Sequence, residues 1–232
     1  MSLTRDDLEN GLLRRLWAEC GGADHHPPLS DAELEASIGA ALTGARPGED
    51  VWVFGYGSLM WNPLIHYVER RPATLGGFHR RFCLWSITGR GTPQCPGLVL
   101  GLDLGGSCQG LAYRLPAAHA AQELKLLWNR EMVSGSYAAR WVRVEGKPCA
   151  ESHGCTEELR ALAFVVNRKH PNYAGKLTLE QVVGAIADAA GHLGTSAEYL
   201  LCTVEALATH GLRDRHLENL RRRLEDAVGR AA

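Results

Sequence analysis

Apolar residues in the first fifty positions follow a helical spacing. After Thr4, which is suited to an N-cap, leucines recur along one predicted helical face, at Leu8, Leu12, Leu13 and Leu16. Ser30 and Glu33 have the spacing of a capping box, and an amphipathic stretch from Leu34 to Leu42 follows them. A break rich in glycine and proline at residues 21–28 separates the two stretches. The pattern predicts two helices before residue 50.

From Val51 onward the period shortens to that of β-strands. Short apolar, β-branched or aromatic runs are separated by clusters of Gly, Pro, Ser and Asn. We therefore expect six strands, at Val51–Phe54, Arg81–Ile87, Leu98–Asp103, Gln109–Leu115, Ala139–Val144 and Leu159–Val166. One helix is predicted among them, from Ala117 to about Met132, after Pro116. Six strands in one stretch suggest a curved, mostly antiparallel sheet or a small barrel.

The C-terminal third returns to a helical pattern. Thr178 with Gln181, and Thr195 with Glu198, have the spacing of capping boxes. A final amphipathic stripe consists of Leu217, Leu220 and Leu224. Together the elements predict an α+β fold in which helices wrap a β core.

The composition is that of an ordinary globular chain. Hydrophobic residues make up 45% and charged residues 22% of the 232 positions. Twenty-five basic and 26 acidic side chains leave a net charge of −1, so no overall field favours nucleic acid or an anionic membrane. The basic runs Arg80-Arg81 and Arg221-Arg222-Arg223 are interpreted as solvated faces. A partner has to be selected by a local site.

The sequence carries none of the usual signals for membrane insertion, secretion or metal binding. No apolar run approaches the roughly 18 residues that span a bilayer. Asp6, Asp7 and Glu9 stand where a signal peptide would be basic and then apolar. The seven cysteines include no C-x-x-C, and the His25-His26 pair has no metal-ligand spacing around it. We expect a soluble, cytoplasmic protein with no metal site and no disulfide framework.

The first candidate for binding chemistry is the segment Gly55-Tyr56-Gly57-Ser58-Leu59, directly after a predicted strand. Glycines allow consecutive backbone N–H groups to turn toward one point, and such a concavity binds a carboxylate. Ser58 can add a hydroxyl donor. The alternative is a tight turn between two strands. The spacing is not that of a P-loop or a dinucleotide fingerprint, and it lacks the glycine that follows the serine in a nucleophile elbow.

The candidate for acid–base chemistry is Glu131. Leu124, Leu127 and Trp128 precede it by seven, four and three positions, so all four residues share one face of the predicted helix. If that face is buried, desolvation raises the pKa of the carboxyl group toward the range in which it takes and returns a proton near neutrality. The alternative is a frayed helix end beside Arg130, with the carboxyl group in water.

Several motifs, in order, resemble the ChaC branch of γ-glutamylcyclotransferases, the glutathione-specific enzymes. The motifs are Val51–Pro63, Arg81–Leu84, Gly89–Pro93, Pro96–Leu98, Gly110–Pro116, Leu127–Met132, His170–Tyr173 and Gly194–Leu200. The likeness runs from Val51 to about Leu220, and ordered motifs across most of a chain are more specific than any single one. We accordingly predict a cyclotransferase domain at residues 51–232 and a helical packing appendage at residues 1–50.

The resemblance implies a small, mostly antiparallel β-barrel flanked by helices. It implies action on glutathione to release 5-oxoproline and cysteinylglycine, with no cofactor or metal. Glu131 matches the family's catalytic acid/base, Tyr173 matches a family tyrosine near the substrate, and Arg90 is a candidate for the glycine end of the tripeptide. The family loop that holds the γ-glutamyl group matches Tyr56, Gly57, Ser58 and Leu59.

The expected reaction is intramolecular, because the α-amine of the substrate attacks its own γ-carbonyl group. Glu131 would remove a proton from the attacking ammonium group and deliver one to the leaving amine. Three other functions stay open. They are a cyclotransferase for other γ-glutamyl amines, a non-catalytic module that binds glutathione or another anion, and a serine hydrolase that uses Ser58.

Overall fold

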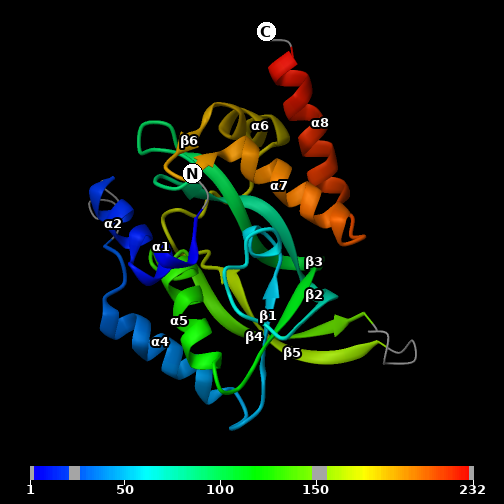
Figure 1. Cartoon of the computed structure of the whole chain (residues 1–232). Coiled ribbons are helices and arrows are strands. Elements are labelled where there is room, and N and C mark those ends of the chain that lie inside the picture. The colour runs from blue at the N-terminus through cyan, green and yellow to red at the C-terminus, as the bar shows by residue number, and fades with distance from the viewer. Residues whose placement is uncertain (1–2, 21–26, 148–155, 230–232) are drawn as a thin grey trace.

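The structure is a computed structural model that describes residues 3–20, 27–147 and 156–229 (Figure 1). Its helices are α1 (Arg5–Glu9), α2 (Leu12–Glu19), α4 (Asp31–Thr43), α5 (Ala120–Glu131), α6 (Leu179–Asp188), α7 (Ser196–Thr209) and α8 (Arg215–Gly229), with a 3-10 helix η1 (Ser58–Met60). Its strands are β1 (Val51–Gly55), β2 (Glu69–Ser86), β3 (Gly97–Leu115), β4 (Tyr137–Gly146), β5 (Glu157–Val166), β6 (Ala190–Gly191) and β7 (Gly194–Thr195).

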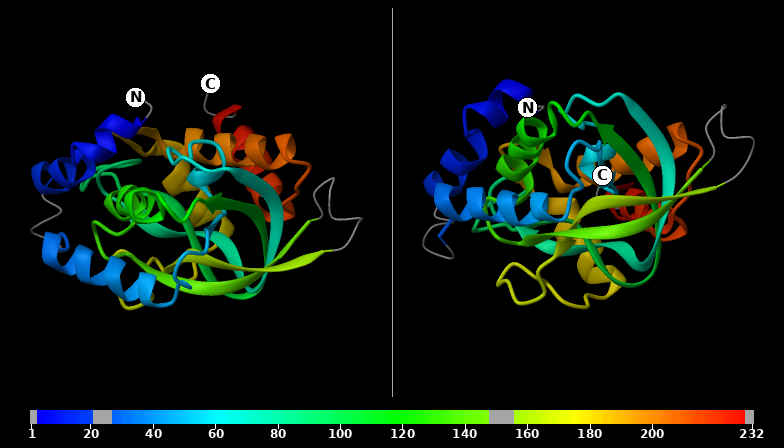
Figure 2. Two further views of the ribbon diagram at one scale, coloured as in Figure 1. Left: turned by 60° about the horizontal axis from the view of Figure 1, so that its bottom comes forward. Right: turned by 90° about the horizontal axis from the view of Figure 1, so that it is seen from below.

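Within the described residues, strands β1 to β5 close into a barrel in the order β1-β3-β2-β4-β5. β1 pairs antiparallel with β3 and parallel with β5, and this parallel pairing closes the barrel. The remaining neighbours pair antiparallel. Helices α1, α2, α4 and α5 lie on one side of the barrel, and α6, α7 and α8 lie on another (Figure 2). The predicted α+β class and the mostly antiparallel barrel are confirmed.

The prediction of six strands is wrong, because two of the predicted runs belong to one strand. Residues 98–103 and 109–115 both lie in β3, which bends at Gly105 and Gly106, where φ is +103° and +70°. The partner strand β2 bends opposite them at Gly77, where φ is +80°, and pairing resumes on both sides. Glycine accepts positive φ without a steric penalty, so the two strands turn together and the ladder continues.

The predicted first helix is divided in two at Gly11, which begins α2 in a left-handed conformation. The capping boxes of Thr4, Ser30 and Thr178 are complete. The box predicted at Thr195 is only half formed: its hydroxyl accepts from the amide of Glu198, but the Glu198 carboxylate pairs with an arginine instead.

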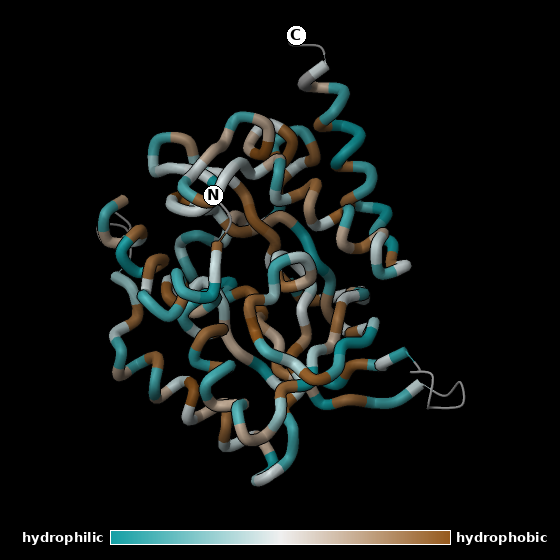
Figure 3. Tube along the Cα trace, in the orientation of Figure 1, coloured by the Kyte–Doolittle hydropathy of each residue, from teal (hydrophilic) through white to brown (hydrophobic). Residues whose placement is uncertain are grey.

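The core fills the barrel and continues under α5. Trp128 on α5 is fully buried and meets Phe164 of β5 edge to face, with ring centroids 5.3 Å apart. Figure 3 shows hydrophobic residues along the barrel strands and hydrophilic residues along much of α8. The buried side of α5 therefore faces the barrel, and this fixes the direction in which its last residue, Glu131, projects.

The N-terminal helices α1, α2 and α4 pack against α5. Arg5 donates from both terminal nitrogens to the carboxylate of Glu123 on α5, at 2.8 and 2.9 Å. The carbonyl group of Leu3 accepts from the Asn62 amide at 2.9 Å. Residues before β1 therefore contact the helix that carries Glu131, and the domain boundary at residue 50 stays a prediction.

The interpretation of Arg80-Arg81 as a solvated face is wrong. Successive side chains of a strand point to opposite sides, and on β2 both of these sides are covered. Arg80 is 3% exposed and pairs with Asp214 at 2.9 Å, while Arg81 pairs with the buried Asp103 at 3.2 Å. Residues 221–223 on α8 are exposed, as predicted.

In the described part of the chain, no helix is long and apolar enough to cross a membrane. The same residues contain no group of three or more His, Cys, Asp and Glu side chains that could hold a metal ion. The described cysteines have free thiols, and Cys149 and Cys155 lie outside the described residues, as does the His25-His26 pair.

Candidate active site

The glycine-containing segment after β1 forms a tight loop that begins η1. The Tyr56 hydroxyl donates to the Phe164 carbonyl at 2.8 Å, and the Tyr56 carbonyl accepts from the buried Arg80 at 2.7 Å. The carbonyl of Leu59 accepts from the Tyr113 hydroxyl at 2.8 Å. The loop is thus held from the barrel wall and from β2, so its shape is set before a ligand arrives.

Gly57 lies where the structure has no room for a side chain. A Cβ atom at this position would lie 2.8 Å from the hydroxyl oxygen of Tyr199, which is closer than real Cβ contacts. Gly57 therefore allows the Tyr199 phenol to approach the loop, where it also interacts with the hydroxyl and amide of Ser58.

Glu131 is the last residue of α5, and its side chain is 13% exposed. Leu124, Leu127 and Trp128 on the same face are completely buried. Burial raises the pKa of the Glu131 carboxyl group, and the adjacent Arg130, with Nε 3.1 Å from Oε1, opposes this rise without cancelling it. The frayed-end alternative is wrong, because the helix extends through Glu131 and carries its carboxyl group inward.

Two tyrosines that the sequence analysis did not select also line this site. Tyr137 begins β4 and donates from its hydroxyl to the Leu100 carbonyl at 2.7 Å, while Tyr199 lies on α7. Burial raises the pKa of both phenols, and the negative charge of Glu131 raises each of them further. Both phenols are therefore uncharged near neutral pH, and the single proton of Tyr137 is already donated to Leu100.

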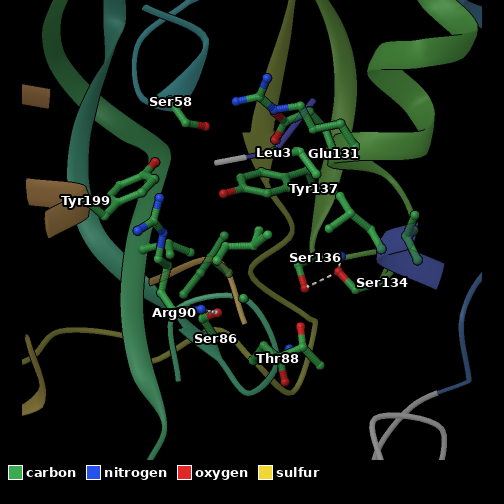
Figure 4. A pocket seen from close by; sticks show the side chains of 18 of the residues that line it. Leu3, Ser58, Ser86, Thr88, Arg90, Glu131, Ser134, Ser136, Tyr137 and Tyr199 are labelled. Carbon is green, nitrogen blue, oxygen red and sulfur yellow. Dashed lines mark hydrogen bonds and ion pairs between the residues drawn. The ribbon is translucent and has the colours of Figure 1, made fainter. Parts of the chain in front are cut away.

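The site consists of two adjoining cavities. A small inner one of about 30 Å³ is enclosed by the loop, Glu131 and the tyrosines, and a large outer one of about 440 Å³ opens beside it. Four residues line both cavities: Ser58, Glu131, Tyr137 and Tyr199. Figure 4 shows these side chains around one end of the space, with the Arg90 side chain reaching toward Tyr199 and Ser86 farther along. Glu131 therefore lies at the boundary between the two spaces.

Arg90 lines the outer cavity, and its contact with substrate stays a prediction. Its Nη1 atom lies 2.8 Å from a carboxylate oxygen of Glu198, which accounts for the half-formed cap at Thr195. The guanidinium group also lies 5.7 Å from the Trp61 ring centroid and 5.6 Å from that of Tyr199. These contacts hold the Arg90 guanidinium group in a fixed position on the cavity wall.

Tyr173 is not brought to either cavity. Its hydroxyl donates to Asp103 at 2.9 Å, and its ring lies beside the Arg81 guanidinium at 5.9 Å. The preceding residue, Asn172, does line the outer cavity. The expected contact between Tyr173 and substrate has no support in this geometry, because the hydroxyl is used in a cluster on the barrel wall.

The two cavities hold a carboxyl group of raised pKa, neutral phenols and a fixed arginine. Among the described residues that line them there is no histidine to activate Ser58, which argues against the serine hydrolase. The fold is a closed barrel, and the site beside it contains one buried carboxyl group of raised pKa, a group that is suited to acid–base chemistry. The chain belongs to the ChaC-like protein family, whose model matches residues 51–227.

Relatives and solved structures agree with this assignment. The chain is 40% identical over 219 residues to an Escherichia coli protein named glutathione-specific γ-glutamylcyclotransferase, covering 94% of this chain and 90% of that one. It is 32% identical to the mouse protein named glutathione-specific γ-glutamylcyclotransferase 1, covering 83% of this chain and 87% of the relative. A crystal structure of the yeast cyclotransferase specific to glutathione superposes with a TM-score of 0.67 at 25% identity, covering 77% and 99% of the two chains.

Proposed function

We propose that this protein is a glutathione-specific γ-glutamylcyclotransferase, a lyase that converts glutathione into 5-oxoproline and cysteinylglycine. The relatives named above support the substrate. The observation that carries the chemistry is the position of Glu131, a desolvated carboxyl group at the boundary between the inner and outer cavities. One group placed there reaches both the attacking nitrogen and the departing nitrogen of a substrate that extends across the boundary.

The position of Glu131 sets the orientation of the substrate. The γ-carbonyl group must lie beside Glu131, because both proton transfers occur at nitrogens bonded to that carbon in the tetrahedral state. The glutamyl part then lies at the boundary with its α-carboxylate toward the loop Tyr56–Leu59, because the inner cavity of about 30 Å³ is too small for the whole group, and the cysteinylglycine part extends into the outer cavity. Backbone N–H groups of the loop would hold the α-carboxylate, and Arg90 would pair with the terminal glycine carboxylate.

The reaction is balanced without water. The Glu131 carboxylate takes a proton from the α-ammonium group, and the freed amine attacks the γ-carbonyl carbon. The resulting tetrahedral oxyanion accepts hydrogen bonds from donors at the loop. Glu131 then gives its proton to the cysteinyl nitrogen as the C–N bond breaks. The ring nitrogen gives up its second proton to the carboxylate, which passes it to the departing amine, so the products are the neutral lactam and the dipeptide with an ammonium group. The carboxylate is regenerated, so one residue acts as base and then as acid.

The tethered nucleophile explains why so few groups suffice. Amine and carbonyl belong to one molecule, so the protein needs only to fold the glutamyl part into the cyclising conformation. Enclosure by Tyr137, Tyr199 and the loop supplies that restraint and excludes water from the amine. Thiols in the cytosol are kept reduced by glutathione, so the proposed substrate supports a cytoplasmic location.

Identification of the products tests this function. Purified protein incubated with glutathione should release 5-oxoproline and cysteinylglycine in equal amounts, and γ-glutamyl-alanine should be a much poorer substrate. Equal rates on both compounds would indicate a cyclotransferase for γ-glutamyl amines in general. Binding of glutathione without any product would indicate a non-catalytic module and contradict the proposal.

A further inference from the structure

Three apolar side chains from the N-terminal segment, residues 3–20, line the outer cavity. They are Leu3, Leu13 and Trp17, and all three precede the part of the chain that matches the family model. Leu13 and Trp17 are four positions apart on α2 and so share a helical face. Trp17 is 6% exposed and packs with Ile87 and Val133. The segment predicted to be a packing appendage therefore forms part of the site.

The N-terminal segment is fixed in this position by polar contacts at its start. Arg5 donates two hydrogen bonds to the buried Glu123 on α5, and Asn129 donates to the Leu8 carbonyl at 3.3 Å. Asn62 donates to the Leu3 carbonyl at 2.9 Å and accepts from Arg130 at its own carbonyl. Because Arg130 also pairs with Glu131, the segment and the catalytic carboxyl group belong to one connected network.

The orientation of the substrate determines which part of it meets these side chains. The inner cavity contains no N-terminal residue among its described lining, whereas the outer one contains three. A group in the outer cavity is bonded to the γ-carbonyl carbon through the nitrogen that departs. The first atoms beyond that nitrogen are those of the cysteinyl residue, whose methylene and thiol are its apolar part.

We propose that Leu13 and Trp17 are specificity-determining residues, which form an apolar wall for the cysteinyl side chain of the leaving dipeptide. This inference rests on the proposed function and adds to it the residues that select the leaving group. The wall provides apolar contact for the thiomethyl group, while Arg90 on another wall neutralises the terminal carboxylate. A γ-glutamyl amide without the thiol side chain gains only the glutamyl contacts.

The test compares Trp17→Ala and Leu13→Ala with Trp17→Phe and Leu8→Ala. Leu8 is 1% exposed in the same segment but does not line the cavity, so Leu8→Ala controls for lost packing. The steady-state constants kcat and KM for glutathione are measured, together with inhibition by each product. In the proposed orientation, cysteinylglycine binds in the outer cavity and 5-oxoproline binds beside the loop. Inhibition by the two products therefore distinguishes weaker binding of the leaving dipeptide from weaker binding at the whole site.

We expect Trp17→Ala to raise KM for glutathione about tenfold, the scale of small apolar changes in a binding pocket, with kcat within about twofold of wild type. Inhibition by cysteinylglycine should weaken by a similar factor, while inhibition by 5-oxoproline stays unchanged. Leu13→Ala should act in the same direction, Trp17→Phe should recover most of the affinity, and Leu8→Ala should leave KM unchanged.

An unchanged KM in both alanine variants, or equal weakening of inhibition by both products, would overturn the inference. So would a rise in KM for Leu8→Ala that matches that for Trp17→Ala. In each of these cases the wild-type protein still releases 5-oxoproline, so the proposed function stands. A wild-type protein that binds glutathione but does not cyclise it contradicts the proposed function itself.

Discussion

The Nε atom of Arg130 lies 3.1 Å from Oε1 of Glu131, its neighbour in sequence at the end of α5. The same arginine donates to the carbonyl of Asn62, so its charge has a fixed position beside the carboxylate. Burial raises the pKa of Glu131, and Arg130 lowers it by a smaller amount. Arg130 therefore limits the rise in the pKa of the Glu131 carboxyl group.

Replacing Arg130 should shift the pH dependence of turnover. In Arg130→Gln the opposing charge is lost, so the pKa of Glu131 rises further. Because the carboxylate form starts the reaction, the acidic limb of the kcat profile should move to higher pH by about one unit, the scale expected from a close opposite charge. Arg130→Lys keeps the charge and should stay near wild type. If the pH profile of kcat is the same in Arg130→Gln and wild type, the ion pair with Glu131 does not influence the catalytic step.

Enlarging Gly57 should impair binding through Tyr199. In Gly57→Ala the new Cβ meets the Tyr199 hydroxyl oxygen at 2.8 Å, so the phenol or the loop has to shift. We expect KM for glutathione to rise about tenfold, the cost of a modest overpacking. Tyr199→Phe removes the clashing oxygen, so the double variant should bind better than the sum of the two single effects predicts. Strict additivity would show that the two positions do not interact.

Arg90 should contribute to affinity more than to the chemical step. Arg90→Met removes one of the two described arginines that line the outer cavity. The proposed contact is with the terminal carboxylate and not with the reacting atoms, so KM should rise about ten- to a hundredfold with kcat nearly unchanged, the value of a hydrogen bond to a charged group. Arg90→Lys keeps the charge without the forked geometry, so its KM should lie between those of wild type and Arg90→Met. Glu198→Gln serves as a control for the ion-pair partner, and a loss equal to that of Arg90→Met would indicate a structural role instead.

The contact between Arg5 and Glu123 should stabilise the protein in a pH-dependent way. Burial would raise the pKa of Glu123, but hydrogen bonds from Arg5 and from the His66 amide outweigh it and hold the pKa below its usual value. A depressed pKa in the folded state gives stability that is present above the unfolded pKa of about 4.3 and is lost as pH falls through the lower folded pKa.

Arg5→Met should therefore reduce the free energy of unfolding by about 1 to 2 kcal/mol at pH 7, less than for a fully buried pair because Arg5 is partly exposed. The difference from wild type should narrow as pH falls through the depressed pKa of Glu123 in the folded protein. Urea unfolding at pH 7 and at a series of acidic pH values measures both quantities. A difference that does not depend on pH would assign the effect to lost packing of the arginine stem.

The local parts of the fold could be predicted from the sequence, because they depend on residues close together in the chain. Capping pairs such as Ser30 with Glu33 marked helix starts, and the spacing of Leu124, Leu127 and Trp128 placed Glu131 on the buried face of α5. Gly105 and Gly106 lie between the predicted strands Leu98–Asp103 and Gln109–Leu115, which are one strand in the structure. A pattern of glycines does not reveal that the partner strand bends at the same place and keeps its pairing.

The composition of the site was less predictable, because it depends on barrel closure and helix packing. Tyr137 follows a serine- and glycine-containing turn and has no local signal. Tyr199 lies in the motif Gly194–Leu200, but the motif does not indicate that its phenol reaches the site. They meet Glu131 only when β4 and α7 are in place. The same reason explains the buried Arg80 and the contribution of Trp17, whose roles depend on elements far away in the sequence.

The most direct measurement is made on Glu131→Gln, which keeps the size of the side chain and most of its hydrogen bonds but cannot exchange the proton. We predict that kcat for 5-oxoproline release falls by a factor of about 10² to 10⁴, the usual contribution of acid–base catalysis. The dissociation constant for glutathione should change less than about threefold. Circular dichroism establishes that the variant is folded. Wild-type turnover in the folded variant would contradict the assignment of Glu131 as the group that moves the proton.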